Sequence, residues 1–200
     1  MINLDVPEKN VRFLSYPPTI EQEEMIGRLV SFAGSGQWED LGLDVPQPDN
    51  LDKAKMLVVT NVARKMALDM RLLGCKFKDD ADNKASICAR TIYDYYIRSN
   101  DNRGTQFVFS DLGTYKPNEW NIYTDIKEKL VRLGIPADEI QFIQCATTER
   151  TRKKLFEEMN NGKVRVLFGS TTMLGTGVNA QQRAVAVHHL EIPWVRHEVA

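Results

Sequence analysis

The sequence from Gly162 to Trp194, GKVRVLFGSTTMLGTGVNAQQRAVAVHHLEIPW, decides the fold that we expect for this chain. Two apolar segments within it, Val164–Phe168 and Ala184–Leu190, have the composition of β-strands. A polar loop separates them, with a Ser-Thr-Thr turn followed by a Gly-x-Gly-x-Asn bend. A dinucleotide-binding fingerprint would place such glycines directly at the start of a long helix. No long helical pattern follows these glycines, so the stretch predicts a strand, a glycine-bearing loop and a second strand.

The loop resembles motif V of superfamily 2 helicases and translocases, in the variant S-T-x-x-x-G-x-G-x-N. The residues that carry the resemblance are Ser170, Thr171, Gly175, Gly177 and Asn179. The variant is closest to the remodeller-like branch, as in methylase-helicase proteins of phages and mobile elements. The resemblance implies the second of two RecA-like lobes, which faces both an ATP cleft and a nucleic-acid track. It also implies that Thr171 contacts a nucleic-acid phosphate and that the nucleotide-binding residues are Gly175, Gly177 and Asn179.

Two further segments resemble motifs of the same superfamily. The apolar segment Gln106–Ser110 resembles motif IV, in which a strand of the second lobe ends beside the nucleic-acid path. A helix is predicted to begin at Thr147 or Thr148 and to end at Met159. It carries Arg152 at the position where the run from motif IVa to motif V has an arginine. We expect no catalytic residue and no metal ligand in this chain. The residues expected to bind nucleic acid are Ser110, Thr147, Arg152 and Thr171.

Strands and helices alternate from Gln106 onward. Helices are predicted over 121–133 and 147–159, and strands over 106–110, 140–144, 164–168 and 184–190. This order predicts an α/β fold, a RecA-like three-layer sandwich with a mostly parallel central sheet. Right-handed crossovers would bring Ser110, Thr147 and the loop 170–179 to one edge of the sheet. Hydroxyl and backbone N–H groups there would suit phosphate, and glycines with positive φ would allow a close approach.

Charge and proline content divide the chain at residue 50. Residues 1–50 form an acidic, proline-rich arm or linker, with three basic and nine acidic residues and one predicted helix from Thr19 to Phe32. Residues 51–200 hold 23 basic and 18 acidic residues, which allows phosphate contacts without requiring them. The resemblance assigns them to a helicase C-terminal RecA-like lobe, truncated before motif VI. A helix capped by Asn61 is expected near the start of this part, with an inner face formed by Val62, Met66, Met70 and Leu73.

Sequence elements of a complete ATPase are missing. The chain contains no G-x-x-x-x-G-K-[ST] phosphate loop and no Asp-Glu box after an apolar strand. The resemblance places motif VI, with its arginine finger, after Trp194, where no matching segment follows. Because an arginine finger contributes roughly 10³–10⁵ to the rate of phosphoryl transfer, we expect this chain alone to be inactive as an ATPase. ATP and Mg²⁺ are expected only in a full-length parent that includes the first lobe, and neither is expected to bind tightly to this fragment.

The same resemblance gives the expected partners. They are DNA, the first RecA-like lobe of the parent chain and, as a further candidate, a DNA methyltransferase domain. No apolar run reaches the length of a membrane span, and residues 1–10 lack a signal-peptide pattern, which favours the cytoplasm and no membrane partner. Cys75, Cys88 and Cys145 form no CxxC pair and are interpreted as reduced, mostly packed thiols.

Two groups of metal-binding residue types are interpreted as structural. Asp79 and its acidic neighbours in the loop 74–83 lack the alternation and terminal glutamate of a calcium site, so the loop is expected to be solvated. His188 and His189 lie in a predicted strand and should point to opposite faces of it. Together with His197, they match no usual zinc spacing.

Two other functions remain open from the sequence. A nucleotide-sugar-binding transferase lobe also places a Gly-Thr-Gly loop after a strand. It predicts a strong pocket for a sugar nucleotide formed by this chain alone, with an acid or base near Gly175. A degenerate lobe that serves as a protein-interaction module predicts instead that changes at Thr171 or Arg152 leave nucleic-acid binding unaltered.

Overall fold

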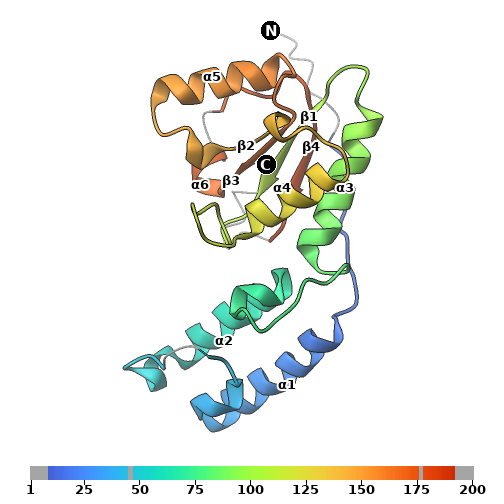
Figure 1. The fold of residues 1–200 in the computed structure, drawn as a ribbon. Coiled ribbons are helices and arrows are strands. Elements are labelled where there is room, and N and C mark those ends of the chain that lie inside the picture. The colour runs from blue at the N-terminus through green and yellow to red at the C-terminus, as the bar shows by residue number, and fades with distance from the viewer. Residues whose placement is uncertain (1–8, 45–46, 176–177, 192–200) are drawn as a thin grey trace, which may run out of the picture.

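A parallel sheet forms the centre of the fold. The computed structural model describes residues 9–44, 47–175 and 178–191. The short apolar segments form four parallel strands in the order β2-β3-β1-β4. β1 lies inside the sheet and pairs with both β3 and β4 (Figure 1). The strands are β1 (Thr105–Phe109), β2 (Ile140–Phe142), β3 (Val166–Gly169) and β4 (Ala184–His189).

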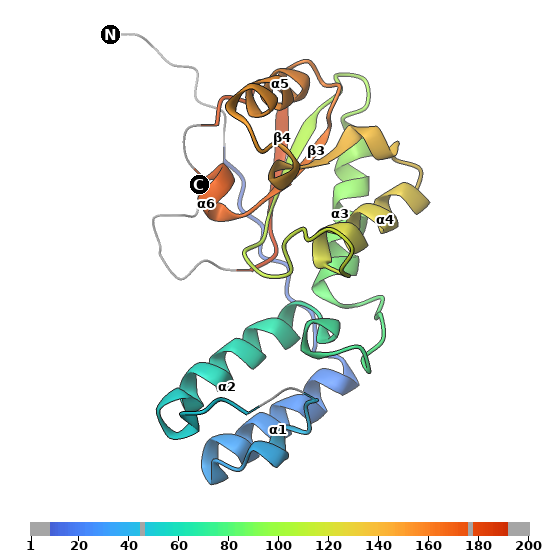
Figure 2. The same ribbon diagram turned by 60° about the vertical axis from the view of Figure 1, so that its left-hand side comes forward.

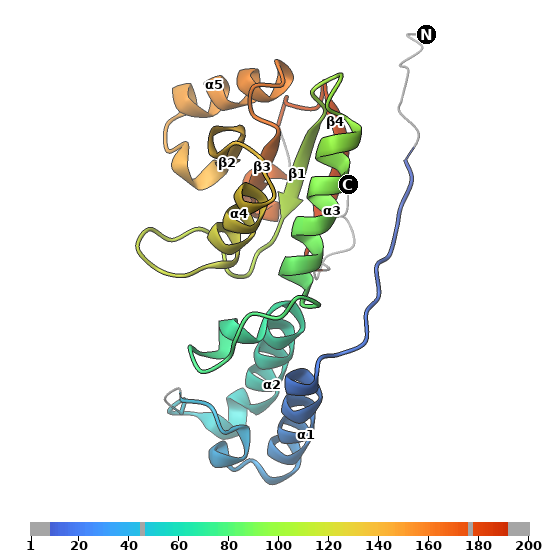
Figure 3. The same ribbon diagram turned by 45° about the vertical axis from the view of Figure 1, so that its right-hand side comes forward.

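Helices cover both faces of this sheet (Figures 1 and 3). Side chains alternate along β1, so Val108 packs with α3 (Lys84–Arg98) and α4 (Ile122–Arg132). Phe107 packs on the opposite face with residues of α5 (Glu149–Asn160) and of the single-turn helix α6 (Thr171–Leu174). The three layers confirm the predicted α/β class, with a parallel sheet between helices. The described residues 178–183, between the glycines and β4, form no helix, as predicted.

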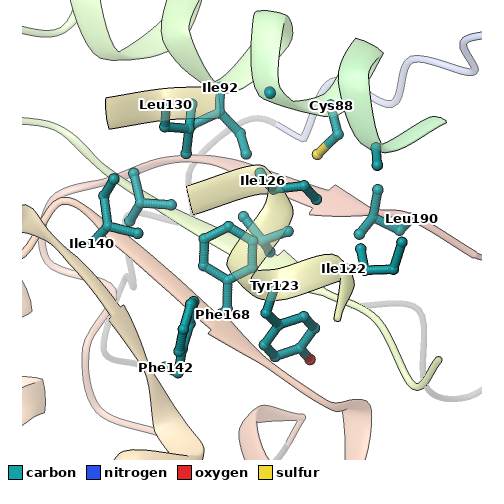
Figure 4. Packing of buried hydrophobic residues seen from close by; sticks show 14 of the residues in the cluster. Cys88, Ile92, Ile122, Tyr123, Ile126, Leu130, Ile140, Phe142, Phe168 and Leu190 are labelled. Atoms are coloured by element: carbon teal, nitrogen blue, oxygen red, sulfur yellow. The ribbon is translucent and has the colours of Figure 1, made fainter. Parts of the chain in front are cut away.

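The core between the sheet and the α3–α4 layer is apolar and closely packed (Figure 4). Tyr123 of α4 lies with its ring centroid 5.7 Å from that of Phe142 and 5.3 Å from that of Phe168. Its hydroxyl donates a 2.7 Å hydrogen bond to the carbonyl of Ser110, directly after β1. Burial raises the pKa of Tyr123, so the hydroxyl stays protonated and remains a donor. This bond fixes the carboxyl end of β1 from within the core.

Polar side chains define where α3, α4 and α5 begin. Asn83 caps α3 and Asn121 caps α4, each by accepting a hydrogen bond from a backbone N–H in the first turn. Thr148 caps α5, and Thr151 completes a reciprocal capping box with it. Of the two threonines considered from the sequence, the cap is therefore Thr148, and Thr147 lies exposed in front of it.

Two helices before the sheet form a pair with a core of its own, α1 (Ile20–Ser35) and α2 (Leu51–Leu68). Thr19 caps α1 in a capping box with Gln22, and the predicted cap is confirmed. Figures 2 and 3 show the pair lying beside the layered sheet, with the two helices next to each other. The shared core also contains the 3₁₀ turns Trp38–Leu41 and Met70–Leu73, so it extends across residue 50, where composition suggested a boundary.

Three local expectations differ from the structure. α2 begins at Leu51, so Asn61 lies inside this helix and does not cap it. β2 ends at Phe142 because residues 143–145 form a 3₁₀ turn. The helix predicted to end at residue 133 ends at Arg132, and Leu133 is 40% exposed. Gly134, with φ of 106°, ends the helical path there, and the chain turns so that Ile135 enters the core.

Arg165, directly before β3, is a fully buried cation. Its guanidinium donates to the carbonyls of Gly104 and Tyr96 at 3.1 and 2.8 Å. It also donates to the Asn100 side chain at 2.9 Å and to the Ser99 hydroxyl at 3.2 Å, and it lies 3.8 Å from the centroid of the Tyr96 ring. One side chain thus connects the end of α3 and the loop before β1 to the start of β3.

Replacing Arg165 with methionine should lower the free energy of unfolding by about 3 kcal/mol, because several buried acceptors lose their donor. Arg183→Met is the matched control, since Arg183 also donates to two carbonyls, those of Asn160 and Asn102, but is exposed. The control should cost less than about 1 kcal/mol. Urea unfolding followed by circular dichroism measures both, and equal losses would contradict a structural role for the buried arginine.

Candidate functional site

The carboxyl ends of β1, β3 and β4 bring polar residues from distant parts of the sequence to one edge of the sheet. Strands that run in parallel end on the same side, which is where open α/β sheets place their ligand groups. Ser110 and Asp111 follow β1, Thr171 comes shortly after β3, and Glu191 comes shortly after β4. We call these four residues the strand-end rim.

Thr171 and Asp111 connect the segments that resemble motifs V and IV. The Thr171 N–H donates to Asp111 Oδ1 at 2.9 Å, and the Thr171 hydroxyl donates to Asp111 Oδ2. Asp111 is exposed and Thr171 is half-buried, so a ligand can reach both side chains. The two donors that were expected to bind a phosphate are therefore present, and in this structure they bind a carboxylate.

Glu191 forms the second connection of the rim. Its Oε1 atom accepts hydrogen bonds from the N–H groups of Asp111 at 2.7 Å and Leu112 at 2.8 Å. The Ser110 hydroxyl lies 3.4 Å from the same oxygen and donates at 2.8 Å to the Leu112 carbonyl. The other oxygen, Oε2, accepts from Arg64 of α2 at 2.6 Å. The rim thus extends from the motif-IV-like segment to the helical pair.

The sequence analysis did not select Glu191 or Arg64. Glu191 follows an apolar strand directly, which is the same signal that selected Ser110, so position alone was sufficient to find it. Arg64 gives no such signal, because it lies inside a helix and 127 residues from its partner.

Thr147 and Arg152 lie at the end of β2, away from the bonds of the rim. The Arg152 guanidinium donates to the Ala146 carbonyl at 3.1 Å, so it braces the segment that precedes α5. Thr147 is exposed. Among the residues that the structure describes, no hydrogen bond connects either side chain to Ser110 or Thr171.

The glycine-bearing bend is only partly described, and Gly177 lies outside the described residues. Gly175 has φ of −72°, so the expectation of a positive φ there is wrong. It ends α6 by donating a 2.7 Å hydrogen bond to the Thr171 carbonyl, and an added Cβ would overlap that oxygen. The backbone carbonyl of Asn179 accepts from the Asn160 side chain at 2.8 Å, which joins the bend to the end of α5.

Three carboxylates near the junction of the helical pair and the sheet lie close enough for a metal ion. Asp69, Asp79 and Asp125 each offer an oxygen within 4.8 Å of the others. Arg71 lies 2.6 to 2.8 Å from all three, and Lys129 lies 2.8 Å from Asp79 and 2.5 Å from Asp125. Because two cations already bind these carboxylates, the cluster is an ion-pair network. Asp79 is 44% exposed, in agreement with the expectation of a solvated loop, and it is ion-paired as well.

The cysteines do not share one environment. Cys88 is buried in the main core, and burial raises its pKa to about 12, so it remains a protonated thiol. Cys75 and Cys145 are free and exposed. The expectation of mostly packed thiols therefore holds for only one of the three.

Comparisons of the chain with protein-family models, with curated proteins and with solved structures gave no match. In the described part of the chain, no helix combines the length and the apolar character needed to cross a bilayer.

His188 and His189 lie on opposite faces of β4, as predicted. The Gln106 amide nitrogen donates to the Ile92 carbonyl at 3.0 Å, so the Gln106 oxygen, 2.8 Å from His188 Nε2, is the acceptor. His188 therefore carries its proton on Nε2. His189 stacks instead on Phe109, with the ring centroids 5.1 Å apart.

His188 should make stability depend on pH. Burial, with a smaller contribution from the charge of His189, lowers the pKa of His188 from 6.5 to about 4. As the pH falls, His188 of the unfolded chain binds a proton before His188 of the folded chain does. The contribution of the neutral His188 ring to the free energy of unfolding is therefore complete above about pH 6.5 and is lost as the pH falls towards 4, by roughly 3 kcal/mol at most. Urea unfolding at several pH values should show a weaker pH dependence for His188→Asn than for wild type. His189→Asn, the control at the more exposed ring, should change it less.

Gly175→Ala should destabilise the chain by about 1–3 kcal/mol, because its methyl group would press on the Thr171 carbonyl. Gly27→Ala is the matched control, since Gly27 lies inside α1 with no atom within 4 Å of an added Cβ. That change should stabilise by about 0.5–1 kcal/mol. Thermal unfolding of both variants tests the prediction, and a stabilised Gly175→Ala chain would refute the close approach.

Proposed function

We propose that this chain is the second RecA-like lobe of an ATP-dependent DNA helicase or translocase. In this proposal it contributes motifs IV and V to the nucleotide cleft and to the DNA track. The observation that supports it best is the pair of hydrogen bonds between Thr171 and Asp111. These bonds join the two segments that resemble motifs V and IV at the edge where parallel sheets bind ligands.

The donors at this edge suit a phosphate backbone. The rim offers the Thr171 hydroxyl and the Asp111 backbone N–H, and the neighbouring Leu112 adds a second backbone N–H. Phosphate contacts of this kind position a nucleic acid without reading its bases. Arg152 and Thr147, beside the neighbouring strand β2, extend the proposed DNA track. Gly175, Gly177 and Asn179 form the proposed edge towards the nucleotide.

The remaining parts of the machinery belong to the proposed parent. ATP and Mg²⁺ bind between this lobe and the first RecA-like lobe, and closure of the two lobes converts hydrolysis into stepping along DNA. The chain alone has no ATPase activity in this proposal. We further propose that the parent protein is cytoplasmic and is associated with a DNA methyltransferase domain.

The two alternative functions are supported to different degrees. A sugar-nucleotide site requires a pocket near Gly175; two cavities lined by described residues lie elsewhere, one of about 320 Å³ beside Tyr16 and α3 and one of about 430 Å³ on the outside of α4. An interaction module is favoured by exposed apolar side chains on α1 and α2. These are Ile26, Val30, Met56 and Leu57.

Binding of this chain to fluorescein-labelled duplex and single-stranded DNA, measured by anisotropy across a salt series, tests the proposal. We expect weak, salt-dependent binding that Thr171→Ala weakens about tenfold, because a hydrogen bond to a charged phosphate is lost. Arg152→Gln should weaken it similarly and reduce the salt slope by about 1.

Two matched variants serve as controls for this experiment. Thr60→Ala removes a hydroxyl of α2 that bonds its own helix, and Arg150→Gln removes an exposed charge from the same helix as Arg152. Both should bind DNA like wild type or nearly so. If neither Thr171→Ala nor Arg152→Gln differs from its control, the interaction module is the better account.

A further inference from the structure

The strand-end rim contains a complete set of anion donors, and one carboxylate of the chain already occupies it. Two consecutive N–H groups, at Asp111 and Leu112, point at the same oxygen of Glu191. The Ser110 hydroxyl is near that oxygen, and the Arg64 guanidinium binds the other. Since the Ser110 hydroxyl donates its proton to the Leu112 carbonyl, the donors of this site are the two amides and the arginine, which bind either a carboxylate or a phosphate.

The carboxylate excludes any other anion from these donors. The Glu191 side chain is 12% exposed and that of Arg64 is 32% exposed, so the ion pair is mostly covered and solvent reaches it chiefly from the Arg64 side. A phosphate oxygen cannot reach the two N–H groups while Glu191 Oε1 is 2.7 and 2.8 Å from them. The negative charges of Glu191 and Asp111 also repel an approaching phosphate.

We propose that Glu191 is a gate on the rim: its carboxylate occupies a phosphate site formed by the Asp111 and Leu112 amides and Arg64, and a DNA phosphate binds there when Glu191 moves out. This inference rests on the proposed function, since it names the ligand and the regulation of the same edge. The exchange replaces one singly charged anion by another on the same donors. It needs rotation of the Glu191 side chain and no change in the strands.

Arg64 connects the gate to the helical pair. It lies on α2, whose end also reaches the main core through Leu68. A shift of α2 therefore moves Arg64 relative to Glu191, and loss of their 2.6 Å contact favours release of the carboxylate. In the reverse direction, a phosphate that displaces Glu191 forms an ion pair with Arg64, and this ion pair holds α2 in place.

The test compares Glu191→Gln with wild type in full-chain binding to duplex DNA at low salt. Glutamine keeps the shape of the side chain but lacks the charge, so it competes less well for Arg64 and the amides. We expect about tenfold tighter binding than wild type, corresponding to removal of one competing charge–donor interaction of about 1.4 kcal/mol. Arg64→Gln in the same chain should abolish this gain.

Glu128→Gln is the matched control, because it removes the same charge from an exposed position on α4, away from the rim. It should change binding less than twofold. A second measurement does not depend on affinity: in ¹⁵N NMR spectra, the Asp111 and Leu112 amide signals should move on addition of a short DNA duplex or inorganic phosphate. They should move at lower ligand concentration in Glu191→Gln than in wild type.

The outcomes separate the gate from the proposed function. Equal or weaker DNA binding by Glu191→Gln, with amide signals that do not respond, overturns the gate, and if Thr171→Ala still weakens binding the helicase-lobe proposal stands. If inorganic phosphate moves the amide signals but Thr171→Ala does not affect DNA binding, the anion site is supported and the DNA-track assignment fails. A gain with Glu128→Gln equal to that with Glu191→Gln overturns the gate as well, because net charge would then explain it.

Discussion

The position of β1 between β3 and β4 is the constraint on which the rest of the structure depends. Because both neighbours run parallel to it, the residues after all three strands emerge at one edge. The backbone after β1 then lies between Thr171 on one side and Glu191 on the other. The Tyr123 hydroxyl holds the Ser110 carbonyl from the core side, and Arg165 anchors the opposite ends of β1 and β3.

The edge produced in this way is polar, and its hydrogen-bond donors already have acceptors within the chain. Donors that suit phosphate are bonded to Asp111 and Glu191, so the N–H groups of Asp111, Leu112 and Thr171 all have an acceptor within the chain. This arrangement stabilises the loops and at the same time lowers the affinity for an anionic ligand. In the proposed function, contacts of this strength would allow DNA to be released in each cycle.

The helical pair is attached to the sheet by charged and apolar contacts close to this edge. Arg71 and Lys129 bridge three carboxylates, including Asp125 of α4, while Arg64 reaches Glu191. Arg71 also lies 4.6 Å from the centroid of the Trp120 ring. Separating the members of this network would leave charges without a partner. The network therefore favours one orientation of the helical pair relative to the sheet. The pair therefore contacts the rim directly through Arg64.

Local signals in the sequence determined the layered class, the order of strands and helices, and several helix starts. Thr19 and Asn121 cap their helices through residues three positions away, so the sequence nearby is sufficient. Apolar periodicity also selected the buried Val62, Met66, Met70 and Leu73 correctly. The resemblance to motifs IV and V selected Ser110 and Thr171, which the structure brings to one rim.

Only the tertiary structure decided how those residues are bonded. Glu191 meets the Asp111 amide across 80 residues and Arg64 across 127, and no local pattern encodes such distances. Arg165 alternates with apolar neighbours as a solvent-facing residue would, yet the fold surrounds it with acceptors and buries it. The physical reason is the same in each case. Hydrogen bonds and ion pairs depend on which side chains the packed strands bring within about 3 Å, and that is set by the strand order and not by the neighbouring sequence.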